Sequence, residues 1–256
     1  NINDAYIIDK YGRKILDFKI NNLHVVGYSS PINKKINKKR LLKKLHTNKK
    51  LIDAIPYLTS YYKDYWGFCI EYTKYKKIIS DYKDTDLFHV LIDSSFKKKG
   101  SLTYGELILK GESKSEILVS TYICHPSMAN NELSGMIVSM GLANYFTKKK
   151  LKKTIRFIFI PETIGSITYL ARNFSYLKKH VIGGYNLSCI GDNNNHSCMF
   201  TKYENTQSDK ALIEAYKKLR ITYKKYSFLK RGSDERQYNS PGIELPIASI
   251  FSTIHH

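Results

Sequence analysis

The chain has few of the features that mark membrane proteins, disulfide-rich proteins or repeat proteins. None of its apolar runs approaches the about 18 residues that a membrane span requires. Its four cysteines are far apart and form no Cys-x-x-Cys pair, which is typical of a reducing cytoplasm and does not favour a zinc site made of these cysteines. There is no internal repeat and no low-complexity linker. The sequence therefore predicts a cytoplasmic protein without a membrane span.

Arginine is also scarce, although the formal net charge is +20. A strongly basic chain can bind nucleic acid by neutralising phosphates. Here the lysines are spread along the whole chain among Ile, Asn and Tyr residues, whereas bidentate contacts with bases and phosphates are made mostly by arginine. The pattern favours a solvated, lysine-rich surface, and we expect no nucleic-acid partner.

The composition is that of an ordinary globular protein, with 42% hydrophobic and 25% charged residues in a chain of 256. This length allows one large domain or two smaller ones. Residues 1–85 have the pattern of short strands and turns with one basic helical patch, and residues 86–256 alternate between strand and helix patterns. We expect a β-rich accessory domain over 1–85, which could also contribute to the core, and an α/β domain over 86–256.

The periodicity of apolar residues predicts the individual elements. In the first part it predicts a hairpin of residues 5–12 and 13–20, a strand at 23–28 and a helix at 38–45. An aromatic-rich segment at 55–70 is interpreted as core and interdomain packing in preference to a ligand platform. In the second part the predicted strands are 87–92, 102–110, 117–124, 155–160 and 185–190, and the predicted helices are 136–149, 167–174 and 208–219. Near-continuous apolar strands alternating with helices indicate an α/β sandwich with a mostly parallel central sheet.

The most informative segment is residues 116–135. An apolar, β-branched run ends at His125, followed by a Pro-Ser turn at 126–127, an Asn-Asn-Glu cluster at 130–132 and a helical pattern. A buried strand that delivers an imidazole to its carboxyl end is how open α/β sheets build sites. A purely structural histidine is the alternative, but the polar cluster after it favours a site, and the arrangement indicates a metal-dependent hydrolase.

Glu162 follows a second buried-strand pattern, at 154–160, in the sequence Pro-Glu-Thr-Ile-Gly-Ser. A carboxylate in a cleft can act as general base on a metal-bound water. The alternative is an acid in the first turn of the following helix, where negative charge is favourable. We favour the functional interpretation because Glu162 and His125 would share one edge of the sheet.

A third candidate segment is Gly-Ser-Asp-Glu-Arg-Gln-Tyr at 232–238. Here Glu235 could be a metal ligand, and Arg236 could bind a substrate carboxylate through two hydrogen bonds. A charged surface loop is an equally good interpretation. Asp192 is a further strand-end carboxylate, with a weaker case.

Together these segments resemble a known family: bacterial aminopeptidase-like domain proteins associated with polysaccharide biosynthesis, which are related to the zinc exopeptidases of the aminopeptidase Y and glutamate carboxypeptidase group. The resemblance implies a phosphorylase/hydrolase-like three-layer α/β sandwich with a small β-rich domain, truncated here at its C-terminus. The motifs that carry the resemblance are Leu-His-Val-Val-Gly-Tyr-Ser at 23–29, Ile-Pro-Tyr-Leu-Thr-Ser-Tyr-Tyr at 55–62, Trp-Gly-Phe-Cys at 66–69, Cys-His-Pro-Ser at 124–127, Asn-Glu-Leu-Ser-Gly at 131–135, Pro-Glu-Thr-Ile-Gly-Ser at 161–166 and Gly-Ser-Asp-Glu-Arg-Gln-Tyr at 232–238.

The exopeptidase ligands carry over only in part. The first metal histidine falls on His125, and the general base of the paired glutamates falls on Glu162, but the second glutamate falls on Thr163. The metal-bridging aspartate falls on Asn131, whose amide oxygen is a weaker ligand and cannot bridge two ions as a carboxylate does. The late histidine falls on Glu235.

A further aspartate ligand falls on Ser188, or on Asp192 if the alignment shifts. The closing His255 and His256 are given no role. The departures point to one zinc ion, held by His125 with Glu162 or Glu235.

We therefore predict an aminopeptidase-like metallohydrolase that cleaves an amide bond in a peptide or an N-acylated glycan conjugate, with Asn131 or Arg236 orienting the substrate. The alternative is a catalytically inactive binding or scaffold protein of the same fold in surface polysaccharide synthesis. The sequence leaves open whether the chain forms a homo-oligomer.

Overall fold

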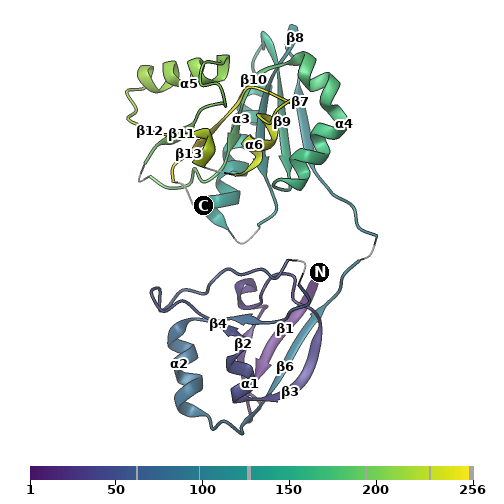
Figure 1. Cartoon of the computed structure of the whole chain (residues 1–256), viewed down its shortest axis with the longest axis vertical. Coiled ribbons are helices and arrows are strands. Elements are labelled where there is room, and N and C mark those ends of the chain that lie inside the picture. The colour runs from purple at the N-terminus through teal and green to yellow at the C-terminus, as the bar shows by residue number, and fades with distance from the viewer. Residues whose placement is uncertain (62, 98, 126–127, 194, 231, 254–256) are drawn as a thin grey trace. The chain divides into compact units, whose positions relative to one another are not determined.

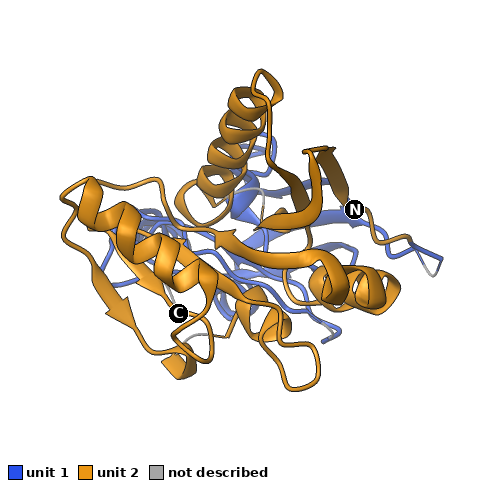
Figure 2. Ribbon diagram, turned by 90° about the horizontal axis from the view of Figure 1, so that it is seen from above, with its two compact units in different colours: residues 1–100 blue, residues 101–256 orange. Residues whose placement is uncertain are grey.

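The computed structural model describes residues 1–61, 63–97, 99–125, 128–193, 195–230 and 232–253. The chain divides into two compact units, residues 1–100 and 101–256, each with its own sheet (Figures 1 and 2). The predicted turn at 126–127 and the closing His255 and His256 lie outside the described residues. Among the described helices, none has the length and apolar character needed to cross a membrane.

The first unit contains a four-stranded antiparallel sheet in the order β2-β1-β6-β3 and a short parallel pair, β4-β5. Its core includes Ile7, Leu41, Phe68 and Phe88, which are fully buried. The elements are β1 (Ile2–Ile8), β2 (Lys14–Asp17), a 3-10 helix η1 (Asn22–His24), β3 (Ile32–Asn37), α1 (Lys38–Leu42), β4 (Leu45–His46), β5 (Phe68–Cys69), α2 (Tyr72–Asp81) and β6 (Leu87–Ser94).

The predicted N-terminal hairpin is confirmed, since β1 and β2 pair antiparallel. Asp9 closes its turn. One carboxylate oxygen accepts the N–H groups of Tyr11 and Arg13 at 2.9 Å each, and the other accepts the Arg13 Nε–H and the Tyr82 hydroxyl at 2.8 Å each. Gly12 has φ of +80°, a conformation that glycine adopts without strain.

Two strand predictions in this region need correction. Residues 23–28 form η1 and isolated bridges instead of a regular strand, because Asn21 caps a 3-10 turn by accepting the N–H of Leu23. The strand predicted at 87–92 exists as β6, but it pairs with β1 and β3 in the first unit. The first unit accordingly extends to residue 100 and not to 85, because these non-local pairings bind β6 to it.

The second unit has a mixed sheet of seven strands in the order β12-β11-β13-β10-β8-β9-β7. The four central strands β13, β10, β8 and β9 are parallel, and β11 and β7 run antiparallel to their central neighbours. The elements are β7 (Gly105–Leu109), β8 (Ser113–Tyr122), a π-helix η2 (Ala129–Leu133), α3 (Ser134–Thr147), β9 (Lys153–Ile160), α4 (Ile164–His180), β10 (Val181–Leu187), β11 (Ser197–Met199), α5 (Gln207–Lys218), β12 (Lys224–Tyr226), a 3-10 helix η3 (Phe228–Lys230), α6 (Asp234–Tyr238) and β13 (Ile247–Phe251).

Alternate residues of the central strands belong to different core clusters. Leu118 of β8 packs in a cluster with Leu170 of α4 and Tyr238 of α6. The next residue, Val119, packs in another cluster with Ala143 of α3. Successive side chains of a strand point to opposite faces, so both faces of this sheet are covered by apolar side chains from helices. This explains why the strands read as near-continuous apolar runs.

The three helices predicted in the second unit are confirmed as α3, α4 and α5, with α4 longer than the predicted 167–174. Thr206 caps α5 in a reciprocal arrangement with Asp209, whose carboxylate accepts the Thr206 N–H at 2.9 Å. Helix α2 was not predicted from the sequence.

Candidate active site

The candidate site lies at the carboxyl ends of β8, β9 and β10 (Figure 1). The chain leaves β8 towards β9 on one side and leaves β10 towards β13 on the other, so a topological switch point falls between β8 and β10. Parallel α/β sheets bind ligands in the crevice at such a point. Tyr122 pairs with Ile160, and the Ile123 N–H donates to the Ile160 carbonyl at 2.9 Å. The segments that follow, with His125 and Glu162, therefore begin at the same edge.

His125 lies in a cluster with Cys124 and Glu132. Its Nδ1 atom is 2.5 Å from Glu132 Oε1 and 3.2 Å from Cys124 Sγ, and the Cys124 and Glu132 ligand atoms are 3.5 Å apart. Glu132 comes from η2, a π-helix, which is a form of helix that often occurs at functional sites. The Met128 N–H donates to the His125 carbonyl at 2.9 Å, which links the end of the strand to the start of η2.

Cys124 and Glu132 favour the positively charged form of the His125 imidazole. Hydrogen bonds with Cys124 and Glu132 raise the pKa of His125 to about 10, although partial burial of the ring acts to lower it. In this arrangement the imidazole is protonated at neutral pH. Glu132 is fully buried, and its second oxygen, Oε2, has no hydrogen-bond partner among the described residues. A buried carboxylate oxygen without a donor is costly, which indicates a cluster suited to hold positive charge.

The same donor set fits a zinc ion. Within the described part of the chain, Cys124, His125 and Glu132 are the three His, Cys or acidic residues whose ligand atoms all lie within 4.8 Å of one another. A tetrahedral zinc with ligands at about 2.0–2.3 Å places its ligand atoms about 3.3–3.7 Å apart. The 3.5 Å pair already has this spacing, the 3.2 Å pair is slightly closer, and the 2.5 Å pair would have to separate by about 1 Å. A thiolate and a carboxylate together neutralise a divalent ion.

Glu162 lies beside this cluster. Its backbone N–H donates to Cys124 Sγ at 3.2 Å, and its carboxylate Oε1 accepts the Ser233 hydroxyl at 2.5 Å. The residue is half-buried. Thr163, which follows, has φ of +61°, a strained conformation for a β-branched residue and one that commonly occurs at functional sites.

Asp234 holds the strained turn. Its Oδ1 accepts the Thr163 N–H at 2.7 Å and the Ser166 hydroxyl at 2.9 Å, and its Oδ2 is buried without a partner among the described residues. Burial raises the pKa of Asp234 to about 7, with a smaller contribution from the negative charges of Glu162 and Glu235. The hydrogen bonds at Oδ1 oppose this rise.

Glu235 is fully buried in α6, and protein donors surround its carboxylate. Oε1 accepts the Ser233 N–H at 2.9 Å, and Oε2 accepts from Asn186 Nδ2 and Ser249 Oγ at 3.3 Å each. These contacts fix α6 against β10 and β13. Arg236 is exposed, and its Nη2 donates to the Leu229 carbonyl at 3.0 Å.

Asn131 is buried and bridges η2 to the end of β10. Its carbonyl accepts the Cys189 N–H at 3.3 Å, and its Nδ2 lies 3.5 Å from Cys189 Sγ. Asp192 accepts hydrogen bonds from Asn130 Nδ2 and Thr253 Oγ1, both at 3.0 Å.

Sequence reasoning missed the roles of three residues. The apolar run around Cys124 predicts a buried free thiol, although the adjacent His125 indicates that the cysteine could belong to a site. Glu132 reads as part of a polar cluster, and Asp234 as a surface acid. Glu132 contacts His125 from another element, and Asp234 contacts a residue 71 positions away, so a local pattern does not show either pairing.

Solved structures with the same fold include zinc aminopeptidases. The structure of BSAP, a zinc aminopeptidase from Bacillus subtilis, superposes with a TM-score of 0.66 and 15% identity, over 98% of this chain and 73% of that chain. An aminopeptidase from Aneurinibacillus sp. strain AM-1 gives a TM-score of 0.53 and 14% identity, over 98% of this chain and 72% of that one. The chain therefore has an aminopeptidase-like fold.

More similar relatives come from Clostridium acetobutylicum. A "Putative polysaccharide biosynthesis protein with aminopeptidase-like domain" is 43% identical over 255 residues, which is 100% of this chain and 57% of the relative. The crystal structure of a "putative peptidase" from the same organism has a TM-score of 0.92 and 42% identity, over 100% of this chain and 59% of that one. The chain thus spans less than two thirds of the length of either protein.

The family described as a domain of unknown function, DUF4910, matches residues 8–256, and the chain belongs to it. The resemblance to aminopeptidase-like proteins associated with polysaccharide biosynthesis is confirmed.

Proposed function

We propose that residues 101–256 form a single-metal hydrolase of the aminopeptidase-like class, which cleaves an amide bond in a peptide or an N-acylated glycan conjugate. The observation that carries this proposal is the group of Cys124, His125 and Glu132 beside the half-buried Glu162 at one edge of a parallel sheet. On this proposal the second unit is a three-layer sandwich, and residues 1–100 are an accessory domain.

One zinc ion suits the chemistry of these residues. Cys124, His125 and Glu132 would supply three protein ligands and leave a fourth position open, as in catalytic zinc sites. Position 131 holds a neutral amide that packs against Cys189, so it does not offer the bridging carboxylate of a two-metal site. This ligand set differs from the expected one, in which His125 was paired with Glu162 or Glu235. Glu235 instead contributes its hydrogen bonds to the packing of α6.

A bound zinc ion would polarise the carbonyl oxygen of the substrate and lower the pKa of a coordinated water. Glu162 is the proposed general base, because the residue is half-buried, its backbone N–H contacts Cys124 of the cluster, and its carboxylate accepts the Ser233 hydroxyl. Asp234 fixes the backbone of Thr163 and so the direction of the Glu162 side chain.

The test separates metal binding from catalysis. We expect the purified chain to contain one zinc per molecule by plasma mass spectrometry, and His125→Ala and Glu132→Gln variants to lose it. Matched controls are His89→Ala, in the first unit, and Glu112→Gln, an exposed acid of the second unit, both of which should retain zinc.

The catalytic step is tested with Glu162→Gln. This variant should retain zinc but hydrolyse aminoacyl 4-nitroanilides or N-acetylated amino sugars about 100-fold or more slowly than the parent, because a general base contributes about 10²–10⁴-fold. A parent chain without zinc and without turnover of either substrate class would instead favour the inactive binding or scaffold protein.

A further inference from the structure

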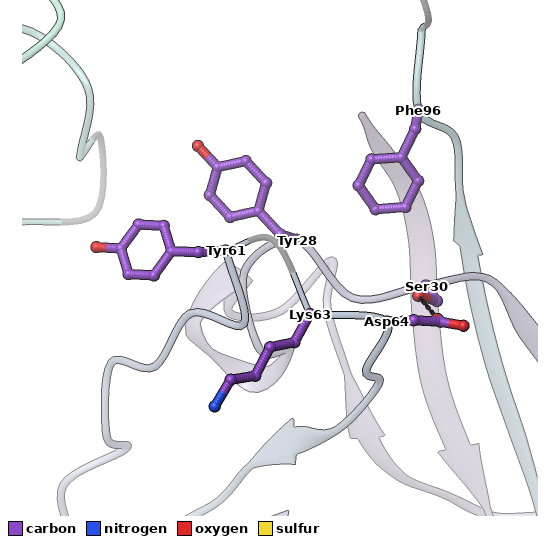
Figure 3. Close-up of a pocket in the computed structure, with 6 residues that line it drawn as sticks. All are labelled: Tyr28, Ser30, Tyr61, Lys63, Asp64 and Phe96. Carbon is purple, nitrogen blue, oxygen red and sulfur yellow. Dashed lines mark hydrogen bonds between the residues drawn. The ribbon is translucent and has the colours of Figure 1, made fainter. Parts of the chain in front are cut away.

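A hollow lies within the first unit, away from the candidate active site in the sequence. Its volume is about 520 Å³. Its walls come from two loops and from the segment after β6 (Figure 3). The lining residues are Tyr28, Ser30, Tyr61, Lys63, Asp64 and Phe96.

Three large aromatic rings stand exposed around this hollow. Tyr28 and Tyr61 are each 56% exposed and Phe96 is 59% exposed. The rings of Tyr28 and Tyr61 lie 5.8 Å apart at an interplanar angle of 32°. Tyr61 belongs to the aromatic-rich segment at 55–70, for which the sequence predicts core and interdomain packing, and its ring is not part of the core of the first unit. A cluster of exposed aromatic rings marks a binding surface.

The backbone presents two of these rings in a strained conformation. Tyr28 has φ of +65° and Tyr61 has φ of +46°, values that bulky residues rarely adopt. Hydrogen bonds between the loops maintain them: the Gly27 N–H donates to the Leu58 carbonyl at 2.8 Å, and the Ser60 N–H donates to the Gly27 carbonyl at 2.9 Å. The Tyr28 carbonyl also accepts the Ser60 hydroxyl at 3.1 Å. The backbone that carries the two rings is therefore held in place before any ligand arrives, which lowers the part of the entropy cost of binding that comes from ordering the loops.

The polar side of the hollow is a hydrogen-bonded pair. The Ser30 hydroxyl donates to Asp64 Oδ1 at 2.5 Å, and the Ser30 N–H donates to the Tyr65 carbonyl at 2.8 Å. Figure 3 shows this pair below the Phe96 ring, with Tyr28 to one side and the Lys63 ammonium directed away from it. Asp64 is exposed, so its carboxylate can accept further hydrogen bonds from a ligand.

We propose that this hollow binds a neutral pyranose ring of a glycan. A pyranose has an apolar face of C–H groups, which packs on an aromatic ring, and a rim of hydroxyl donors, which a carboxylate such as Asp64 accepts. The lining contains one lysine and one aspartate and therefore has no net charge. The hollow accordingly does not favour phosphate or other anions. A peptide anchor would need an enclosed apolar pocket, whereas these rings stand more than half exposed. The proposal rests on the first unit and is independent of the metal site.

The test is saturation-transfer NMR and titration of the whole chain with three neutral trisaccharides: cellotriose, maltotriose and N,N′,N″-triacetylchitotriose. We expect at least one to bind with a Kd of about 1 mM or tighter, through its ring C–H protons. Tyr28→Asn and Phe96→Ala should each weaken this binding about tenfold, because each removes one aromatic face. Asparagine is chosen at position 28 because it tolerates a positive φ.

Tyr11→Ala is the matched control, since Tyr11 is an aromatic residue of the same unit that is 65% exposed and does not line the hollow. It should bind the sugar as the parent does. Absence of binding to all three sugars would overturn the proposal, as would equal binding by the parent and both hollow variants with unchanged thermal melting. Tyr28-dependent binding of tetra-alanine without sugar binding would assign the hollow to peptides and also overturn it.

Discussion

At the scale of single residues, Asp234 shows how burial and function are connected. Its carboxyl group holds the strained backbone of Thr163 and has a pKa raised from 3.8 to about 7, chiefly by burial. The folded chain therefore binds the carboxyl proton of Asp234 more tightly than the unfolded chain does. The stabilisation of the fold by this proton is complete below about pH 4. It is lost as pH rises towards about 7.

We predict that Asp234→Asn removes this dependence. Asparagine keeps an oxygen that accepts the Thr163 N–H, and it has no charge to bury. The free energy of unfolding of the variant should therefore lack the decrease between pH 4 and pH 7 that ionisation of Asp234 causes in the parent. At pH 8 the variant should be more stable than the parent by up to about 4 kcal/mol, from about three pKa units at about 1.4 kcal/mol each. Urea unfolding at pH 5 and pH 8 measures it. Parallel pH dependence in the two proteins would refute the assignment.

The sequence predicts some residues of the proposed site and gives little signal for others. His125 and Glu162 follow apolar runs, and the carboxyl ends of neighbouring strands are positions that a local pattern predicts. The contact of His125 with Glu132 depends on the π-helical turn of η2, and the contact of Asp234 with Thr163 joins residues 71 positions apart. The polar cluster at 130–132 indicates a site near His125 but does not show which of its side chains contacts the imidazole, and the contact of Asp234 with Thr163 has no local signal.

At the scale of elements, the N-terminal hairpin depends on the buried Asp9. Burial alone would raise the pKa of Asp9, but hydrogen bonds from Arg13 and Tyr82 outweigh it and lower the pKa from 3.8 to about 2. The carboxylate therefore stabilises the fold above about pH 4, and this contribution is lost as pH falls towards about 2.

Asp9→Asn should destabilise the chain at pH 7 by about 2 kcal/mol, since about 1.8 pKa units correspond to this free energy and an amide cannot accept all four hydrogen bonds. The difference from the parent should shrink as pH falls below 4. Thermal melts at pH 7, 4 and 3 would show it. Asp53→Asn, at an exposed position of the same unit, is the control.

A second element-scale prediction concerns Arg156, at the centre of β9. Its guanidinium bonds Glu116 of β8 at 2.6 Å and 3.0 Å and Glu106 of β7 at 2.6 Å, and so connects three strands. Arg156→Met would leave Glu116 buried without its cation, and we expect a loss of about 3–5 kcal/mol in unfolding free energy.

The double variant Arg156→Met with Glu116→Gln should recover part of this loss, because the unpaired buried charge is then absent. If the double variant is less stable than Arg156→Met, the charge is not the cause.

Predictions of elements were best where local periodicity decides. The helices α3 and α5 follow from their apolar spacing, and Thr206 is a recognisable cap. The strand β6 was assigned to the wrong part of the chain because an apolar run does not specify its partners. Its pairing with β1 joins residues about 85 positions apart in the sequence.

At the scale of the whole molecule, we expect the net charge of +20 to belong to a solvated surface rather than to a nucleic-acid site. We predict that double-stranded DNA binds with a Kd no tighter than about 10⁻⁶ M at 150 mM salt, without sequence preference, and that raising the salt weakens it further. Fluorescence anisotropy with two unrelated duplexes measures this. A nanomolar Kd, or a strong preference for one duplex, would contradict it.

The two proposed sites lie in different units of the chain, so each can be tested without the other. The proposed glycan-binding hollow is built from residues 28–96, and the proposed hydrolase site from residues 124–235. Loss of sugar binding in Phe96→Ala leaves the metal site intact, and loss of zinc in Glu132→Gln leaves the hollow intact.

The most direct test of the central claim is anomalous scattering at the zinc absorption edge from a crystal of the chain grown without added metal. We predict one peak, within bonding distance of Cys124 Sγ, His125 Nδ1 and a Glu132 oxygen, with the Glu162 carboxylate facing the same opening. No peak at this cluster, or a single peak whose ligands include none of these three residues, would contradict the account.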